Sequence, residues 1–277
     1  MNRSVRVLAL VAVALSLFSA VGCNKLKARD QLNKGVQAYK NQKYEEAINK
    51  FQESVRLDPS LINARLYLAT AYAQLFVPGS TDADNLRYAN QAIQEYENVL
   101  TQDSKNISSI KGIAFLYMNM KEWDKSKQYY KKAVDVDPND PEAYYSVAVI
   151  DWTVAYKTRQ EERTKLGMQP NAPLTDKKVC AKLRESNTAM VDEGKQMLEK
   201  AIQIRPDYDD AMAYLNLMYR EEADLDCDNP AARAEAIKMA DGWVDKVMAV
   251  KKAKAEKAAN QPGGVVLDQP QGDQKQQ

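Results

Sequence analysis

Hydrophobic and polar positions between Ile107 and Pro138 alternate with the period of two short amphipathic helices. Four apolar side chains in the first half follow the spacing i, i+3, i+4, i+7 of one helix face: Ile110, Ile113, Ala114 and Tyr117. After an interruption at residues 119–121, the pattern restarts with Trp123, Ser126, Tyr130 and Ala133. The second helix ends at Asp137 and Pro138, because proline cannot continue it. Neither helix can bury its apolar face alone, so the segment predicts a helical hairpin that packs against further hairpins.

The same pattern recurs along most of the chain. A first copy begins at Ala28 and contains Gly35, Tyr44, Ala47, Phe51, Ser54 and Pro59. A second copy contains Leu68, Ala69 and Tyr72 in its first helix and Ala92, Ile93 and Tyr96 in its second. Later copies contain Val147 and Ala148 with Leu198, Ala201 and Pro206, and then Leu215 and Tyr219 with Ala236 and Ile237. A hairpin repeat of about 34 residues that closes at a proline resembles the tetratricopeptide repeat.

This resemblance implies the fold. We expect an all-α protein, a right-handed superhelical solenoid of stacked antiparallel helix pairs. About five units would cover residues 28–259, and two of them would carry insertions. The loop Val77–Ser80 lengthens the second unit, and either Asp82 or Asp84 caps the helix that follows. Residues 139–206 are long enough for two repeats. Either one unit carries an insertion over residues 153–190, the alternative we favour, or two units are present and the first has lost its pattern.

The N-terminus has the pattern of an export signal. Arg3 and Arg6 precede an apolar run at Val7–Ser19, which is too short to span a bilayer but typical of a signal peptide. Ala20–Cys23 then resembles the bacterial lipobox. The resemblance implies that residues 1–22 are a lipoprotein signal peptide that is removed and that Cys23 is lipidated, with residues 23–27 as a linker. The alternative is an ordinary secretory signal that is cleaved near Ala20.

A lipid anchor at Cys23 would hold an exported protein at the periplasmic face of a membrane. The residue after Cys23 is Asn24 and not the aspartate that marks retention in the inner membrane of some bacteria, which favours the outer membrane slightly. At the other end, residues 260–277 are rich in proline, glycine and glutamine, so we expect a disordered tail. In an oxidising compartment Cys180 and Cys227 would form a disulfide, with two buried free thiols as the alternative.

Composition excludes most catalytic chemistry. The chain has 277 residues, a net charge of +1 and no histidine. Histidine is the commonest general base and metal ligand at neutral pH, and we find no phosphate-binding loop and no nucleophile elbow. We therefore expect no catalytic residues, no metal and no cofactor. The near-neutral charge gives no reason to expect a nucleic-acid partner.

The resemblance also implies where a partner would bind, because the first helices of tetratricopeptide arrays line a groove. The family's groove positions fall on Tyr39, Tyr67, Lys111, Phe115, Tyr145, Val149, Trp152, Tyr214 and Arg220. Aromatic residues and arginine are favoured anchors for a bound peptide or helix. The alternative is that Phe115, Tyr145 and Trp152 pack against the insertion. Leu32 and Val36 occupy positions where the family's carboxylate clamp needs lysine and asparagine, which argues against that clamp.

We consider three functions. The favoured one is a non-enzymatic, membrane-anchored scaffold that binds a peptide or helix of an envelope protein. The second is a lipoprotein that binds the cell wall or a glycan through its tyrosines. The third is an enzyme with a site in the 153–190 insertion, for which Asp151 beside Trp152 is the one unusual carboxylate. Neither the partner nor the oligomeric state follows from the sequence.

Overall fold

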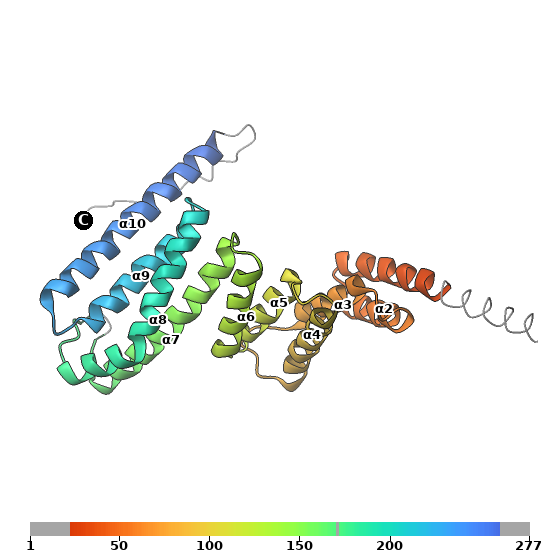
Figure 1. The fold of residues 1–277 in the computed structure, drawn as a ribbon, viewed down its shortest axis with the longest axis horizontal. Coiled ribbons are helices and arrows are strands. Elements are labelled where there is room, and N and C mark those ends of the chain that lie inside the picture. Colours follow the sequence, from red (N-terminus) through yellow and green to blue (C-terminus); the bar gives the residue numbers. More distant parts are fainter. Residues whose placement is uncertain (1–22, 170–171, 261–277) are drawn as a thin grey trace, which may run out of the picture. The chain divides into compact units, whose positions relative to one another are not determined.

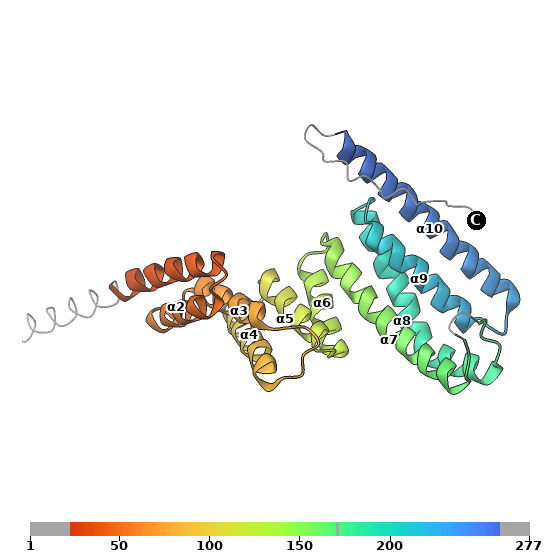
Figure 2. The same ribbon diagram turned by 180° about the vertical axis from the view of Figure 1, so that it is seen from behind.

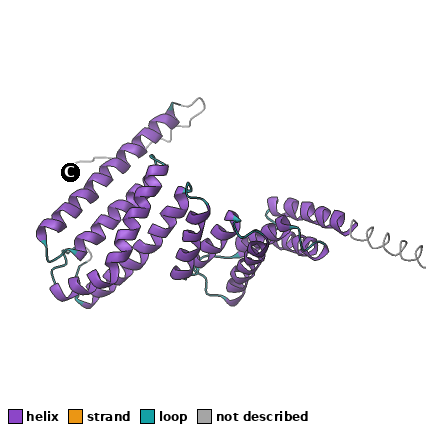
Figure 3. Ribbon diagram, in the orientation of Figure 1, coloured by secondary structure: helices purple, strands orange, loops and turns teal. Residues whose placement is uncertain are grey.

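The structure, a computed structural model, describes residues 23–169 and 172–260. Within these ranges the protein consists of ten helices joined by short turns and loops, with no strands (Figures 1 and 3). The helices form antiparallel pairs that stack on one another, as a tetratricopeptide solenoid requires, so the predicted fold class is confirmed. The chain divides into two compact units. We call them unit 1, up to Pro138, and unit 2, from Asn139 onwards.

Unit 1 contains three hairpins. The first pairs a helix over residues 23–40 with α2, Tyr44–Leu57. The second pairs α3, Ile62–Leu75, with α4, Ala83–Gln102, and the third pairs α5, Ile107–Asn119, with α6, Trp123–Val136. Asp82 is the residue that caps α4, because its side chain accepts hydrogen bonds from the backbone N–H groups of Asp84 and Asn85.

The turns inside two of these hairpins share one backbone geometry. Gln42 and Lys121 have φ angles of 60° and 62°, in the left-handed region. In both turns the next N–H donates to a carbonyl five residues back: Lys43 to Ala38 at 3.0 Å and Glu122 to Tyr117 at 2.9 Å. This bond pattern satisfies carbonyl groups that the end of a helix leaves without partners. The turns therefore reverse the chain within a few residues.

Small side chains allow the helices of unit 1 to approach closely. Ala47, Ala69 and Ala92 are fully buried in one core with Phe51. At two small positions serine replaces alanine, and its hydroxyl bonds to the neighbouring helix. Ser54 donates to the carbonyl of Ala28 at 2.7 Å, and Ser126 donates to that of Ala114 at 2.8 Å. A buried hydroxyl needs such a partner, so serine fits these positions without an unsatisfied polar group.

Unit 2 contains two hairpins with longer helices. Figures 1 and 2 show its four helices side by side: α7, Pro141–Lys165, α8, Lys177–Ile204, α9, Asp209–Leu225, and α10, Pro230–Ala259. Asp140, Asp176 and Asn229 cap α7, α8 and α10 through side-chain hydrogen bonds to backbone N–H groups. The extra residues of the 139–206 segment lengthen α7 and α8 within a single hairpin. The predicted insertion is thus continuous with the two helices that flank it.

Three further sequence predictions concern the ends and the interior. The proposed linker, residues 23–27, is helical, and Cys23 is exposed. The predicted signal peptide, residues 1–22, and residues 261–277 of the predicted tail lie outside the described residues. Asp151, which the sequence singles out as the one unusual carboxylate, lies in the interior of unit 2, where it is 1% exposed.

Cys180 of α8 and Cys227 of the α9–α10 connection are joined by a disulfide, with their Cα atoms 6.0 Å apart. Cys180 belongs to a buried cluster with Leu174, Leu183 and Leu225. The bond therefore attaches the lengthened hairpin to the last one. In the described part of the chain, no helix is long and apolar enough to cross a membrane.

Candidate functional site

One face of α7 carries a row of large side chains. Tyr145, Val149, Trp152, Tyr156 and Arg159 follow one another at intervals of four and three residues, so they share a face of the helix. The helix is anchored at its start by Asp140, which accepts a hydrogen bond from the N–H of Glu142. The first four, from Tyr145 to Tyr156, are half-buried or exposed and form a surface of unit 2, whereas Arg159 is 14% exposed and reaches into the interior.

Residues of α9 extend this row into a continuous set of aromatic contacts. The ring of Tyr145 lies 5.2 Å from that of Tyr208, the residue that precedes α9, and 5.4 Å from that of Tyr214. Trp152 meets Tyr214 edge to face at 5.4 Å and stacks on Tyr156 at 4.9 Å. We call these five residues, Tyr145, Trp152, Tyr156, Tyr208 and Tyr214, the aromatic row. Rings in such contacts hold each other in fixed orientations.

The hydroxyls of three tyrosines in the aromatic row, Tyr145, Tyr208 and Tyr214, remain neutral at physiological pH. Burial raises the pKa of Tyr208 to about 12 and also raises the pKa of Tyr145 and of Tyr214. A side-chain hydrogen bond joins Tyr145 to Tyr214. Hydroxyls with raised pKa values donate and accept hydrogen bonds but do not serve as bases. The row is therefore suited to recognition rather than proton transfer.

The two ends of the aromatic row differ in charge. The guanidinium of Arg205 lies 4.5 Å from the centre of the Tyr208 ring, but Asp140, Glu142 and Asp210 lie near this end as well. At the other end Arg159 lies 5.2 Å from the Tyr156 ring. Arg159 also belongs to the group of arginines described below. The row thus runs from a surface of mixed charge to a basic one.

Unit 1 contains the other predicted groove residues, which form no comparable row. Tyr67 is 38% exposed and stacks on Phe51 at 5.6 Å, and Tyr39 packs edge to face on Tyr44 at 5.4 Å. Phe115 is 48% exposed on α5, one turn after the half-buried Lys111. An exposed phenylalanine of this kind is a candidate contact for a partner. Unit 1 therefore offers isolated contact points, whereas unit 2 offers a connected surface.

The alternative prediction, that aromatic side chains pack on the insertion, holds only in part. Trp152 stacks on Tyr156, which belongs to the lengthened part of α7, but it also contacts Tyr214 outside it. The ring of Tyr145 contacts the rings of Tyr214 on α9 and of Tyr208, the residue before α9. Sequence reasoning missed Tyr156 and Tyr208 as members of the surface. Tyr156 could have been found, because it continues the spacing of Tyr145 and Trp152.

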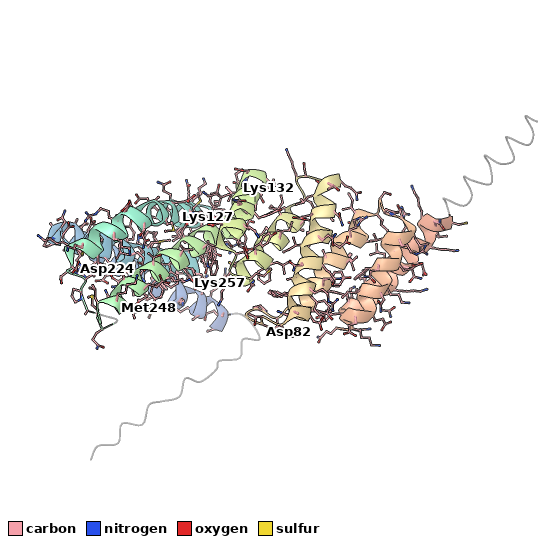
Figure 4. The ribbon with its side chains drawn as sticks, turned by 90° about the horizontal axis from the view of Figure 1, so that it is seen from below. Asp82, Lys127, Lys132, Asp224, Met248 and Lys257 are labelled. Atoms are coloured by element: carbon pink, nitrogen blue, oxygen red, sulfur yellow. A yellow bond between two sulfur atoms is a disulfide. The ribbon has the colours of Figure 1, made fainter. Side chains whose placement is uncertain are left out.

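Beyond Tyr156, charged residues from α7, α9 and α10 meet in the interior of unit 2. Arg159 contacts Glu221 and Asp224, each at 2.8 Å, and Arg163 contacts Asp224 at 3.3 Å. Arg163 also donates to the backbone carbonyls of Gln169 and Ala172. Asp224, labelled in Figure 4, lies among the helices of unit 2 and is 5% exposed. Buried charges of this kind require partners, and these residues supply them to one another.

A pocket of about 350 Å³ opens beside these ion pairs. We call it the arginine pocket, and its lining residues are Arg159, Arg163, Ala172, Arg220, Asp224, Arg233 and Ile237. Among them, Arg220 is the one that the sequence had placed in the groove. The remaining arginines could not be assigned from the sequence, since Arg159 and Asp224 are far apart along the chain. The sequence showed only that Arg159 and Arg163 share one helix face, through a spacing of four residues, and that Glu221 and Asp224 share another, through a spacing of three.

The carboxylate of Glu221 sits behind this pocket and is 2% exposed. Burial raises its pKa to about 7, while the neighbouring Arg159 lowers it and Asp224 raises it further. A carboxyl group with such a pKa can mark a functional site, but a structural ion-pair network shifts pKa values as well. Within the described residues no group of three or more histidine, cysteine, aspartate or glutamate side chains is arranged to hold a metal ion.

Comparison with known sequences identifies the repeats. A TPR-repeat profile matches residues 35–75, and a second tetratricopeptide-repeat profile matches residues 89–150. The chain contains tetratricopeptide repeats. No curated protein sequence matches it. Proteins built from these repeats are typically non-enzymatic scaffolds.

Several solved structures share the fold of this tetratricopeptide-repeat protein. A crystal structure of the MamA protein is similar with a TM-score of 0.56 and 15% identity, covering 83% of this chain and 94% of that one. MamA from Desulfovibrio magneticus RS-1 is similar with a TM-score of 0.55 and 15% identity, covering 82% and 96%. YrrB, another TPR protein, has a TM-score of 0.52 and 16% identity, with 86% and 97% covered. At these identities the similarity shows the fold alone.

Proposed function

We propose that this tetratricopeptide-repeat protein is a membrane-anchored scaffold that binds a peptide or helix of an envelope protein through the aromatic row of unit 2. The observation that supports this proposal is the continuity of the row. Five aromatic side chains from α7, α9 and the residue before α9 touch in sequence, and all of them except the buried Tyr208 are half-buried or exposed. Tyrosine and tryptophan supply large contact areas at low entropic cost, which makes them frequent anchors of bound peptides.

The rigidity of the row supports the same proposal. Tyr145 and Trp152 both contact Tyr214, so α7 and α9 hold one another's rings in place before a partner arrives. A surface ordered in advance loses less side-chain entropy on binding. YrrB, one of the proteins with a similar fold, is a TPR protein with an unusual peptide-binding site. For the present chain we infer that a peptide is the kind of ligand that fits.

Affinity capture from cells after crosslinking tests the binding surface. The full chain is compared with the Trp152→Ala/Tyr145→Ala variant and with Trp243→Ala, a matched tryptophan removal on α10 outside the row. We expect an envelope protein that the first variant loses and the second retains. Recovery that is unchanged in Trp152→Ala/Tyr145→Ala would contradict the proposal, and recovery of cell-wall fragments alone would favour the glycan-binding alternative.

A separate variant addresses unit 1. Tyr67 and Phe115 are its most exposed aromatic side chains among the predicted groove residues. If the partner depends on Tyr67→Ala/Phe115→Ala and not on the unit 2 variant, the binding surface lies in unit 1. Circular dichroism of each variant separates lost binding from lost folding.

We also propose that Cys23 carries the membrane anchor. The support is the order of basic residues, apolar run and small residues before this cysteine, together with the exposure of Cys23. Metabolic labelling with an alkyne fatty acid tests it. The full chain is expected to be labelled and to sediment with membranes, whereas Cys23→Ala is expected to lose both properties. Labelling that persists in Cys23→Ala would contradict a lipid at this residue.

A further inference from the structure

The arginine pocket contains more positive charge than its own carboxylates balance. Four arginines and one aspartate line it. Asp224 is shared among three of these arginines, at 2.8 Å from Arg159, 3.3 Å from Arg163 and 3.7 Å from Arg233. Glu221 behind the pocket also contacts Arg159, but burial raises its pKa to about 7, so at neutral pH it offsets only part of one charge. The four arginines therefore outnumber the two carboxylates and leave the pocket basic, and guanidinium groups are suited to binding carboxylates in two-point contacts.

The four arginines divide into two that are fixed and two that can reach a ligand. Arg159 and Arg163 are 14% and 3% exposed, and their contacts to Glu221 and Asp224 hold them in position. Arg233 is 29% exposed, and its contact to Asp224 is the longest of the three, at 3.7 Å. Arg220 is 41% exposed. The fixed pair supplies a constant positive field, and the other pair can form new hydrogen bonds.

A carboxylate already occupies one of these positions. Asp241 of α10, itself 64% exposed, accepts a hydrogen bond from Arg220 at 2.8 Å. Asn216 holds the same guanidinium from the other side at 2.9 Å. An exposed ion pair contributes little stability, so a carboxylate from another molecule can replace Asp241 at small cost. The contact with Asp241 shows that Arg220 can bind a carboxylate, and it means that Asp241 would compete with a carboxylate ligand for this position.

We propose that the arginine pocket binds a carboxylate group of a partner peptide, with Arg220 and Arg233 as the residues that contact it. This inference rests on the proposed function, because the aromatic row leads to the pocket. Arg159 contacts both the Tyr156 ring and the pocket carboxylates, and so joins the two surfaces. A peptide along the row would present an acidic side chain, or its own C-terminal carboxylate, at the Arg159 end.

Binding of short model peptides to the full chain tests the pocket without knowledge of the partner. The probes are fluorescently labelled hexaglutamate with an amidated C-terminus, amidated hexaglutamine, and hexaglutamine with a free C-terminus. Fluorescence anisotropy at physiological ionic strength measures each dissociation constant. We expect hexaglutamate to bind at least tenfold more tightly than amidated hexaglutamine. Tighter binding of hexaglutamine with a free C-terminus would instead assign the pocket to a chain end.

Five variants assign the binding to the pocket. Arg220→Gln and Arg233→Gln are each expected to weaken hexaglutamate binding at least tenfold. Lys238→Gln removes a positive charge from α10 outside the pocket and should change the affinity for hexaglutamate less than twofold. Asp241→Asn removes the competitor and should tighten binding several-fold. Arg233→Lys keeps the charge without the two-point geometry, so its loss of affinity would distinguish recognition by the guanidinium from attraction by charge alone.

The outcomes separate this inference from the proposed function. Equal binding of hexaglutamate and amidated hexaglutamine would overturn the carboxylate site, as would equal losses in Lys238→Gln and Arg233→Gln. Trp152→Ala/Tyr145→Ala is expected to keep hexaglutamate binding while it loses the captured envelope protein. If the pocket binds carboxylates but capture does not depend on the aromatic row, the proposed function fails and the pocket remains.

Discussion

Glu221 holds its carboxyl group in the interior of unit 2, close to a second carboxylate, Asp224. Arg159 and Arg163 of α7 face this pair, and Arg233 of α10 contacts Asp224. Removal from water disfavours the ionised form of Glu221 more than the guanidinium of Arg159 favours it, since the pKa is raised to about 7. The residue therefore changes its charge near neutral pH.

This shift makes the stability of the fold depend on pH. Because the pKa of Glu221 is higher in the folded than in the unfolded chain, the folded state holds an extra proton between the two values. The resulting stabilisation is complete below the unfolded pKa and is lost as the pH rises through about 7. We expect the free energy of unfolding to fall by up to about 3 kcal/mol between pH 5 and 8 from this group.

The Glu221→Gln variant tests the assignment, because glutamine cannot titrate. Urea denaturation at several pH values should show a smaller fall in the free energy of unfolding between pH 5 and 8 for this variant than for the unsubstituted protein. Glu222→Gln, a substitution at the adjacent and more exposed position, should retain the full fall. A decline of the same size in Glu221→Gln would show that another group is responsible.

At the scale of single elements, the turn between α5 and α6 carries a measurable strain. Lys121 adopts a φ of 62°, a conformation that costs a residue with a Cβ atom about 1–2 kcal/mol and that glycine adopts freely. We expect Lys121→Gly to raise the free energy of unfolding by about 1 kcal/mol, as glycine does at other helix ends of this kind. Denaturant midpoints measure the change.

The control for this prediction is a glycine substitution at a position inside a helix, where glycine is expected to destabilise. Lys132, labelled in Figure 4, is exposed in the interior of α6. Lys132→Gly should lower the free energy of unfolding by about 1 kcal/mol, because glycine gains flexibility in the unfolded chain. Two lysine-to-glycine substitutions would then act in opposite directions. A destabilising Lys121→Gly would contradict the interpretation of the turn.

Close packing between the first helix and α2 leads to a second prediction at this scale. A Cβ atom on Gly35 would lie 2.4 Å from a ring carbon of Phe51, whose side chain is fully buried. The ring cannot move away without disturbing the core, so Gly35→Ala should destabilise the protein by about 1–3 kcal/mol. Gly242 of α10 has open space around its Cα, and Gly242→Ala should stabilise it by about 0.5–1 kcal/mol. Thermal melts of both variants provide the comparison.

Helices and their limits were the part of this structure that the sequence predicted well, because their signals are local. Asp140 followed by Pro141 marked the start of α7, and the period of apolar residues defined α5 and α6. Contacts between distant segments were not predictable in the same way. The pairing of Arg159 with Asp224 depends on which faces of α7 and α9 meet, and helical periodicity does not contain that information. For the same reason the sequence did not show that Asp151 lies in the interior.

At the scale of the whole chain, a disulfide covalently joins α8 to the connection between α9 and α10. Cys180 and Cys227 are separated by 47 positions, so their bond closes a long loop in the unfolded chain. Such a loop is expected to contribute about 4 kcal/mol, mainly by reducing the entropy of the unfolded state. We predict that a reducing agent lowers the denaturation midpoint of the full chain. The Cys180→Ser/Cys227→Ser variant should already have the lower midpoint and should not respond to the reducing agent.

Two outcomes would contradict this prediction. One is a midpoint of the unsubstituted protein that does not change under reduction, and the other is two free thiols detected in the native protein by mass spectrometry after alkylation. The second result would favour the alternative of buried free thiols.

The order in which the helices pack has a consequence for how the chain is made. From α2 to α6 in unit 1, and from α7 to α10 in unit 2, each helix packs mainly on its neighbours in sequence, with smaller contacts between α3 and α5 and between α7 and α9. Contacts between near neighbours in sequence form quickly, since little chain must be brought together. A polypeptide that emerges gradually from a ribosome or a translocation channel can therefore fold one hairpin at a time. The cross-link between Cys180 and Cys227 can form only after Cys227, 47 positions further along the chain, has been delivered.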